Sequence, residues 1–148
     1  MLKRSRSEKK FSKHEDYKKA LDIHNKAKMF IKNALQHHTI YMSYHQIAEI
    51  YHVLGFRGSK LPHDYVHKFI LAILASKRII KVPVAFSHIL KSLELSTKSG
   101  IHIWDFLCIV PIAEHLDIGY SIDKHFQHPV FMELEVKIDN PLGAWIST

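Results

Sequence analysis

Residues 40–54 read Ile-Tyr-Met-Ser-Tyr-His-Gln-Ile-Ala-Glu-Ile-Tyr-His-Val-Leu, and the expected fold follows from this stretch. It begins with a short apolar strand at about Thr39–Met42 and continues, after Ser43, into a helix at about Gln46–Leu54. Serine is favoured before a helix because its side-chain oxygen accepts a hydrogen bond from a backbone N–H of the first turn. Gly55 then marks the end of the helix. A strand that passes directly into a helix is typical of α/β proteins.

The rest of the chain repeats this alternation. Apolar residues at helical spacing predict helices at about Tyr17–Gln36, Pro62–Ser76, Val84–Leu95 and Ile101–Leu116. Short apolar runs predict strands at about Arg78–Val82 and Gly119–Ile122, with a fourth candidate at Val130–Ile138. Pro111 falls inside the last helix, where an interior proline costs about 3 kcal/mol or more unless the helix kinks. This order predicts parallel βαβ units, with helices on both faces of a central sheet.

The two ends of the chain differ from this pattern. Residues 1–15 are rich in Lys and Arg and poor in apolar residues, and we expect a basic flexible arm there. Residues 16–140 carry the alternating pattern, and their length fits one domain. Residues 141–148 contain Pro141 and Gly143, which are typical of a loop or tail. We therefore expect one folded domain between an arm and a tail.

The composition limits the classes of protein that we consider. Hydrophobic residues make up 47% of the 148 residues, which is enough for a core, but no run of about 18 apolar residues predicts a membrane span. No apolar stretch follows the basic N-terminus, so the sequence predicts no secretory signal. Cys108 is the single cysteine, which excludes an intrachain disulfide and favours a reducing compartment. We therefore expect a cytoplasmic protein without a membrane segment.

The charge balance is strongly basic. The net charge is +7 with neutral histidines, and the isoelectric point is about 9.5. Such a surface favours RNA or DNA because phosphate contacts release counterions, although Lys-rich surfaces also serve solubility. The 13 histidines are scattered, and neither the pair His37–His38 nor the pair His45 and His52 matches a zinc spacing with cysteine partners. The charge thus leaves nucleic-acid binding and plain solubility open.

Three acidic residues interrupt apolar surroundings. Asp105 lies in the run Ile103–Ile109, where its helical face is apolar and burial of a carboxylate is costly. Asp123 follows an apolar strand, and parallel sheets bind ligands beyond the carboxyl ends of their strands. Glu49 lies within an apolar helix. Each also has a plain structural explanation: a first-turn helix residue for Asp105, a turn residue for Asp123 and a solvated helix face for Glu49.

Taken together, these carboxylates suggest a metal site. Clustered carboxylates raise one another's pKa unless a cation binds. Mg²⁺ and Mn²⁺ prefer carboxylate oxygens and water, and divalent ions held in this way activate water for phosphodiester hydrolysis. The site requires that Glu49, Asp105 and Asp123 meet in space, which a sequence does not reveal.

The order of these segments resembles the PIN-domain ribonucleases. Residues 40–54 are similar to that family's second strand, serine cap and first acidic helix. The stretches Gly100–Asp105 and Tyr120–Phe126 are similar to its later acidic segments. Within the second stretch, Ser-x-Asp-x-x-Phe at 121–126 is similar to the family's Thr/Ser-x-Asp-x-x-Phe. The resemblance covers about Ala20–Asn140 and rests on the order and spacing of the motifs together.

This resemblance implies a PIN-like three-layer sandwich, in which helices flank a central parallel sheet. It implies an endoribonuclease that depends on Mg²⁺ or Mn²⁺ and cleaves RNA, with Glu49, Asp105 and Asp123 as catalytic residues and metal ligands. Ser121 would support the site by hydrogen bonding. Many members of the family are VapC-type toxins, so the resemblance also implies a homodimer and a small antitoxin partner.

The chain departs from the family at its beginning. Family members open with an apolar strand that ends in Asp-Thr-Asn, whose aspartate is a metal ligand. Arg4–Phe11 is neither apolar nor strand-like, and Glu8 substitutes for that aspartate only through a forced alignment. An active enzyme then requires either a product that begins upstream of Met1 or another carboxylate in that place. The alternatives are a degenerate PIN-like module that binds RNA or a protein partner without cleavage, and a purely structural α/β domain.

Overall fold

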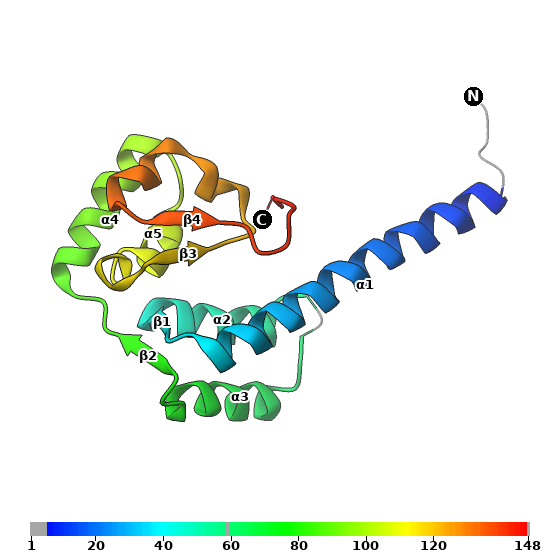
Figure 1. Ribbon diagram of the computed structural model, residues 1–148, viewed down its shortest axis with the longest axis horizontal. Helices are drawn as coiled ribbons and strands as arrows, with labels where there is room; N and C mark the ends of the chain where they lie inside the picture. Colours follow the sequence, from blue (N-terminus) through cyan, green and yellow to red (C-terminus); the bar gives the residue numbers. More distant parts are fainter. Residues whose placement is uncertain (1–5, 59, 148) are drawn as a thin grey trace.

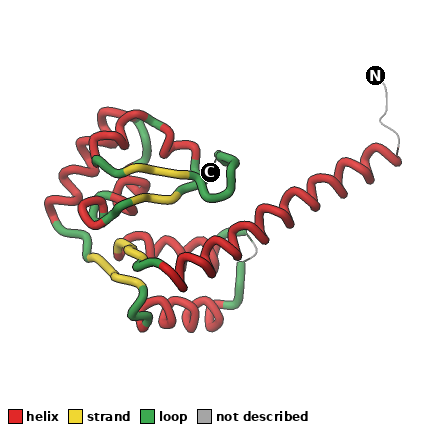
Figure 2. Tube along the Cα trace, in the orientation of Figure 1, coloured by secondary structure: helices red, strands yellow, loops and turns green. Residues whose placement is uncertain are grey.

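Helices and strands alternate along the chain in the computed structural model, which describes residues 6–58 and 60–147, with side chains from Lys13 onward (Figure 1). The helices are α1 (Arg6–His37), α2 (Tyr44–Phe56), α3 (His63–Ala75), α4 (Phe86–Ser99) and α5 (Ile103–Ile109). The strands are β1 (Ile40–Ser43), β2 (Ile79–Val82), β3 (Ile118–Tyr120) and β4 (Lys137–Asp139). Short 3-10 helices follow α5 and β3, namely η1 (Ala113–His115), η2 (Lys124–Gln127) and η3 (Pro129–Leu134). The protein is therefore mixed α/β, as expected, with much more helix than strand (Figure 2).

The strands form two parallel pairs. β1 pairs with β2 so that Ile40 lies opposite Ile79, and β3 pairs with β4 so that Ile118 lies opposite Lys137. In the projection of Figure 1 the strands follow the order β4, β3, β1, β2. We expected one central sheet, whereas in the described part of the chain each pair is a sheet of its own. Parallel pairing is thus confirmed, but a continuous sheet across both pairs is not formed.

The expected helix Ile101–Leu116 is shorter than its apolar run. α5 begins at Ile103 and ends at Ile109, and the chain turns there into η1. Pro111 explains this end, because proline has no N–H for a helical hydrogen bond and its ring collides with the carbonyl group four residues earlier. Its ring is fully buried, so the apolar run continues as core although the helix does not.

The expected strand Val130–Ile138 is also wrong over most of its length. Its first part forms the 3-10 helix η3, which starts with Pro129, and only Lys137 and Ile138 belong to β4. Glu135 separates the two parts in a left-handed conformation, with φ of 55°. The buried side chains of this segment alternate too irregularly for an extended strand, because a strand buries every second residue.

The expected basic arm is helical where it is described. Residues 1–5 lie outside the described residues, but residues 6–15 belong to α1. All side chains of residues 13–26 are exposed, and α1 projects from the rest of the molecule (Figure 1). Its C-terminal end is attached, since the Phe30 ring contacts the Tyr120 ring edge-on at 4.8 Å. Although α1 is long, no described helix is both long and apolar enough to cross a membrane.

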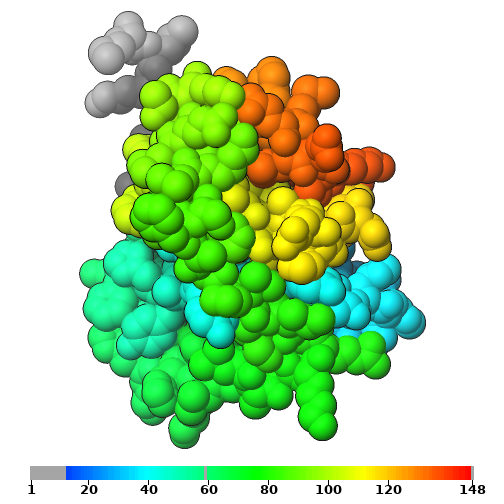
Figure 3. Space-filling view, turned by 90° about the vertical axis from the view of Figure 1, so that its left-hand side faces the viewer, coloured from blue at the N-terminus to red at the C-terminus, as the bar shows by residue number. Residues whose placement is uncertain are grey.

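Two apolar clusters form the core, one with each pair of strands. The first cluster buries Leu95, Ile101, Phe106, Ile109, Val130 and Phe131. The second cluster buries Ile47, Ile73 and Ile79. In Figure 3 the cyan and green residues of α2 and α3 fill the lower part of the molecule, and the lime and orange residues of α4 and η3 fill the upper part. α5 packs against α2, β1 and α4, and it therefore joins the two halves.

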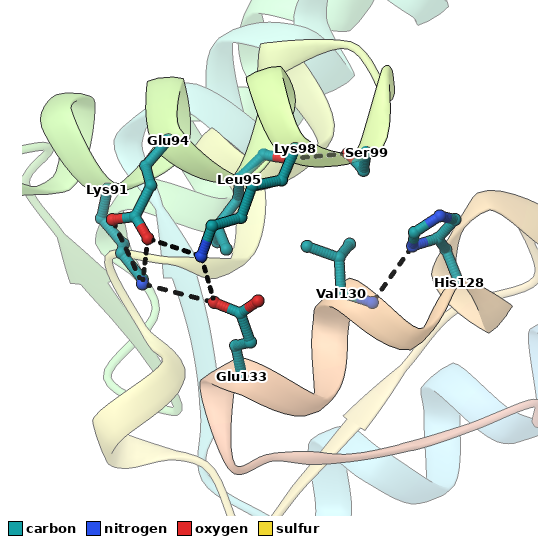
Figure 4. A network of polar contacts seen from close by, with 8 residues as sticks. All are labelled: Lys91, Glu94, Leu95, Lys98, Ser99, His128, Val130 and Glu133. Atoms are coloured by element: carbon teal, nitrogen blue, oxygen red, sulfur yellow. Dashed lines mark hydrogen bonds and ion pairs between the residues drawn. The ribbon is translucent and has the colours of Figure 1, made fainter.

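A surface charge network connects η3 to α4 (Figure 4). Lys98 Nζ donates to Glu94 Oε1 at 2.9 Å and to Glu133 Oε2 at 3.3 Å, and Lys91 Nζ lies 3.7 Å from the same Glu133 oxygen. The hydrogen bond from Lys98, followed by that from Lys91, lowers the pKa of Glu94. Exposed ion pairs contribute little to stability, so we expect this network mainly to orient η3.

Candidate metal centre

Glu49 is carried by α2, whose start is fixed by Ser43. Ser43 is fully buried, and its Oγ accepts a hydrogen bond from the Gln46 backbone N–H at 3.1 Å. This is the helix cap that the sequence predicted. Ile47 packs in the second apolar cluster. Glu49, two residues later and thus on another helix face, points toward α5, where its Oε2 accepts a hydrogen bond from Cys108 Sγ at 3.2 Å.

Asp105 lies in the first turn of α5, next to the fully buried Phe106. Its side chain is only 22% exposed. Burial raises the pKa of Asp105, and the negative charge of Asp123 and then of Glu49 raises it further, whereas His125 lowers it. Charges influence a pKa in this way only when they are close. The structure therefore brings Asp105 and Asp123 into one group of ligand atoms, and Glu49 lies beside it, against Cys108 one turn along α5 from Asp105.

Asp123 lies three residues beyond the end of β3, at the carboxyl edge where a ligand site was expected. Its Oδ1 accepts a hydrogen bond from the His125 backbone N–H at 2.9 Å and so caps η2. The Asp123 backbone N–H donates to Ser121 Oγ at 3.1 Å. Ser121 thus supports the loop that presents Asp123 through the backbone.

The C-terminal segment joins this edge of the molecule. Ile146 forms an isolated parallel bridge with Asp123. Its backbone N–H donates to the Ile122 carbonyl at 2.8 Å, and its carbonyl accepts from the Lys124 N–H at 2.9 Å. The expected tail at residues 141–148, of which Thr148 lies outside the described residues, therefore passes directly beside the loop that carries Asp123.

His125 belongs to the same group, although the sequence did not single it out. Its Nδ1 lies 3.4 Å from Asp105 Oδ2 and 3.5 Å from Asp123 Oδ1. This nitrogen is buried and makes no well-formed hydrogen bond within the described chain. Asp105, Asp123 and His125 offer ligand atoms that all lie within 4.8 Å of one another. In the sequence, the one feature that points to His125 as a site residue is its position in the Ser-x-Asp-x-x-Phe motif, two residues after Asp123.

A second group of ligand atoms adjoins the first. A ring nitrogen of His45, a Glu49 oxygen and Cys108 Sγ also lie within 4.8 Å of one another. Burial, and next the hydrogen bond to Glu49, raises the pKa of the Cys108 thiol far above its usual range, so that the free thiol is neutral. Sequence spacing assigned His45 no cysteine partner. Folding provides one because α2 packs against α5.

The first group, together with Glu49 of the adjoining group, has the donors that Mg²⁺ or Mn²⁺ requires. Glu49, Asp105 and Asp123 supply carboxylate oxygens, which are the preferred ligands of these ions. Half-buried carboxylates close to one another are costly without a neutralising cation, and the pKa of Asp105 is raised first by burial and then by Asp123. The residues present therefore fit such an ion. No family model matches the chain, and comparisons with curated proteins and with solved structures found no similar protein.

Proposed function

We propose that this protein is a metal-dependent endoribonuclease that hydrolyses RNA phosphodiester bonds, with Glu49, Asp105 and Asp123 as the ligands of Mg²⁺ or Mn²⁺. The observation that carries the proposal is the grouping of Asp105 of α5 with Asp123 of the loop after β3, with Glu49 of α2 beside them through its contact with Cys108. In this proposal the two strand pairs and their helices belong to a PIN-like three-layer sandwich. A homodimer and a small antitoxin partner, as in VapC-type toxins, belong to the same proposal.

The bound ion would supply an activated water and neutralise charge on the scissile phosphate. The side chains would position it: Ser121 holds the backbone of Asp123, and the first turn of α5 presents Asp105. His125 Nδ1 lies within 3.5 Å of an oxygen of each aspartate and is a further potential ligand of the ion. The net charge of +7 supports an RNA substrate, because a basic surface attracts the phosphate backbone.

A second function, RNA binding without cleavage, is favoured by the same histidine. A protonated His125 would place a positive charge between Asp105 and Asp123, where it offsets the repulsion that a metal ion would otherwise relieve. The basic charge serves binding and cleavage equally well. The two functions differ in whether a metal ion or the imidazolium neutralises the aspartates.

The direct test is cleavage of a structured RNA by the purified chain, with Mn²⁺ and with EDTA. The nuclease proposal predicts cleavage only with the metal, which is lost in Asp105→Asn and kept in Asp22→Asn. Asp22 is a matched control because it is exposed on α1 and pairs with Lys26 at 3.0 Å, away from the site. Cleavage that continues in EDTA or in Asp105→Asn would assign the activity to something other than this site.

Metal binding is tested separately by thermal unfolding. A ligand that binds only the folded chain raises the melting temperature, so Mn²⁺ should stabilise the wild type but not Asp123→Asn. A chain that binds RNA in a strongly salt-dependent manner, but neither cleaves it nor responds to Mn²⁺, is the binding module instead. A chain that binds neither RNA nor Mn²⁺ contradicts both functions.

A further inference from the structure

We propose that His45, Glu49 and Cys108 form a Zn²⁺ site at the contact between α2 and α5. The site is distinct from the Mg²⁺ or Mn²⁺ site, with which it shares Glu49. Its nitrogen, oxygen and sulfur donors already lie within 4.8 Å of one another.

The backbone places these donors together. His45 and Glu49 are four residues apart on α2, so both side chains lie on one helix face, one turn from each other. Pairs at this spacing are a common way for a helix to supply two metal ligands. Cys108 comes from α5, and its Sγ already donates to Glu49 Oε2 at 3.2 Å. Two helices thus hold the three donors.

The His45 ring gives an independent indication of a ligand. Its Nε2 is buried and has no hydrogen-bond partner among the described residues. A buried polar atom without a partner opposes folding, and a metal ion is one partner that removes this cost. The ring stacks on Trp104 with centroids 5.4 Å apart and planes 11° from parallel, so its orientation is fixed before any ion binds.

The donor types favour Zn²⁺ over the ions of the first site. Imidazole nitrogen and thiolate sulfur suit Zn²⁺, whereas Mg²⁺ and Mn²⁺ prefer oxygen. Three protein ligands leave the fourth tetrahedral position to water. Cys108 would bind as a thiolate and release its proton to the solvent, and the charge of the ion would offset the burial that keeps the free thiol neutral.

The shared Glu49 gives the site a regulatory consequence, which rests on the proposed nuclease function. Glu49 Oε2 faces Cys108, and a carboxylate that holds Zn²⁺ there offers less negative charge to the ion beside the aspartates. Zn²⁺ should therefore inhibit cleavage that depends on Mn²⁺. The inhibition should disappear in Cys108→Ser, which loses the zinc thiolate but keeps Glu49, Asp105 and Asp123.

Binding of the metal is tested without RNA, using Co²⁺ as a spectroscopic substitute for Zn²⁺. We expect a thiolate-to-cobalt charge-transfer band that Zn²⁺ removes by displacement. Cys108→Ser should abolish the band. His45→Gln should weaken metal binding at least about tenfold, because even the loss of a residue that only hydrogen-bonds to a metal ligand weakens binding by that much. His52→Gln is the matched control, because His52 is exposed on the same helix and stacks on Phe56 instead. Binding without this band, or a band that Cys108→Ser retains, would overturn the proposal.

Trp104 provides a second measurement that does not depend on whether Cys108→Ser folds. In a Trp145→Phe background its fluorescence reports on the stacked His45 ring. Zn²⁺ should change this emission in the parent chain and in His52→Gln, but not in His45→Gln. An emission that ignores Zn²⁺ would refute the site even if RNA cleavage is observed, and a response without any cleavage would leave the zinc site standing while the nuclease function fails.

Discussion

Asp105 is the residue where burial and like charge act together. A carboxyl group whose pKa is raised on folding binds its proton more tightly in the folded chain than in the unfolded chain. The charged form therefore opposes folding. This cost is full at a pH above the folded pKa and disappears as the pH falls below the unfolded value. The helix N-terminus offsets part of it, because Asp105 lies in the first turn of α5.

We therefore predict that Asp105→Asn stabilises the protein, by about 0.5–2 kcal/mol, the range that surface-charge improvements commonly reach. The gain should be largest well above the ordinary range of aspartate and should shrink as the pH falls toward that range. Urea denaturation at a series of pH values measures it, with Asp22→Asn as a control that should change stability little. A loss of stability at every pH would identify Asp105 as a structural helix residue.

The sequence revealed some residues of the candidate site and not others. Glu49 and Asp105 were visible because each carboxylate lies among apolar neighbours, and Asp123 was visible because it follows an apolar strand. His45 and Cys108 were not, because their proximity arises only when α2 packs against α5. Local patterns show which side chains are out of place, whereas packing of distant helices decides which of them meet.

At the scale of one element, α2 depends on its first residue. Ser43→Ala removes the Oγ that accepts the Gln46 N–H, and we expect a loss of about 0.5–2 kcal/mol in the free energy of unfolding. Ser92→Ala is a matched control, because Ser92 is equally buried but its Oγ has no partner within the described chain. Removing an unsatisfied hydroxyl should be neutral or stabilising. Equal losses in the two variants, measured by chemical denaturation, would exclude capping as the cause.

Helix and strand positions followed from periodicity, but two element types did not. The capped start of α2 and the strands β1 and β2 were predicted from apolar spacing and from Ser43. The apolar run that starts at Ile101 was predicted to be one helix. A continuous apolar pattern does not distinguish a buried helix from a buried turn. Pro111 ended that helix early, and the chain continues into η1. The segment predicted as the strand Val130–Ile138 instead begins with the 3-10 helix η3. The apolar composition of a segment predicts that it is buried. Its backbone conformation depends on the hydrogen bonds that the surrounding structure allows.

At the scale of the whole molecule, α1 divides into a projecting part and an attached part. Ala20 is exposed among exposed neighbours, whereas Ala34 is partly buried near the attached end. Glycine costs about 1 kcal/mol relative to alanine inside a helix. We predict that Ala34→Gly lowers the free energy of global unfolding by about that amount and that Ala20→Gly leaves it unchanged, because its helix segment unfolds locally. Hydrogen exchange and denaturation measure both effects, and equal global losses would show that the outer part of α1 is docked.

The pairing of the strands is a whole-molecule property that the sequence left open. A strand of three or four residues shows its apolar face but does not show its partner. The expected single sheet therefore became two pairs, each with its own apolar cluster. The candidate site draws Glu49 from α2 beside the second cluster and Asp123 from the loop beside β3, so its geometry requires that the two halves stay together.

The two halves should unfold as one unit, because α5 packs against α2 and β1 as well as α4. Ile73→Ala, in the second cluster, should lower stability by about 2–5 kcal/mol. It should also shift the unfolding midpoint of Trp145, which precedes Ile146 in the segment beside Asp123 and β3 in the other half, when urea denaturation is followed by fluorescence in a Trp104→Phe background. Ile80→Ala is the control, since Ile80 is 40% exposed and should cost less than about 1 kcal/mol. A Trp145 midpoint that Ile73→Ala leaves unchanged would mean that the halves unfold separately, and the carboxylates would then need a bound ion or partner to hold them in place.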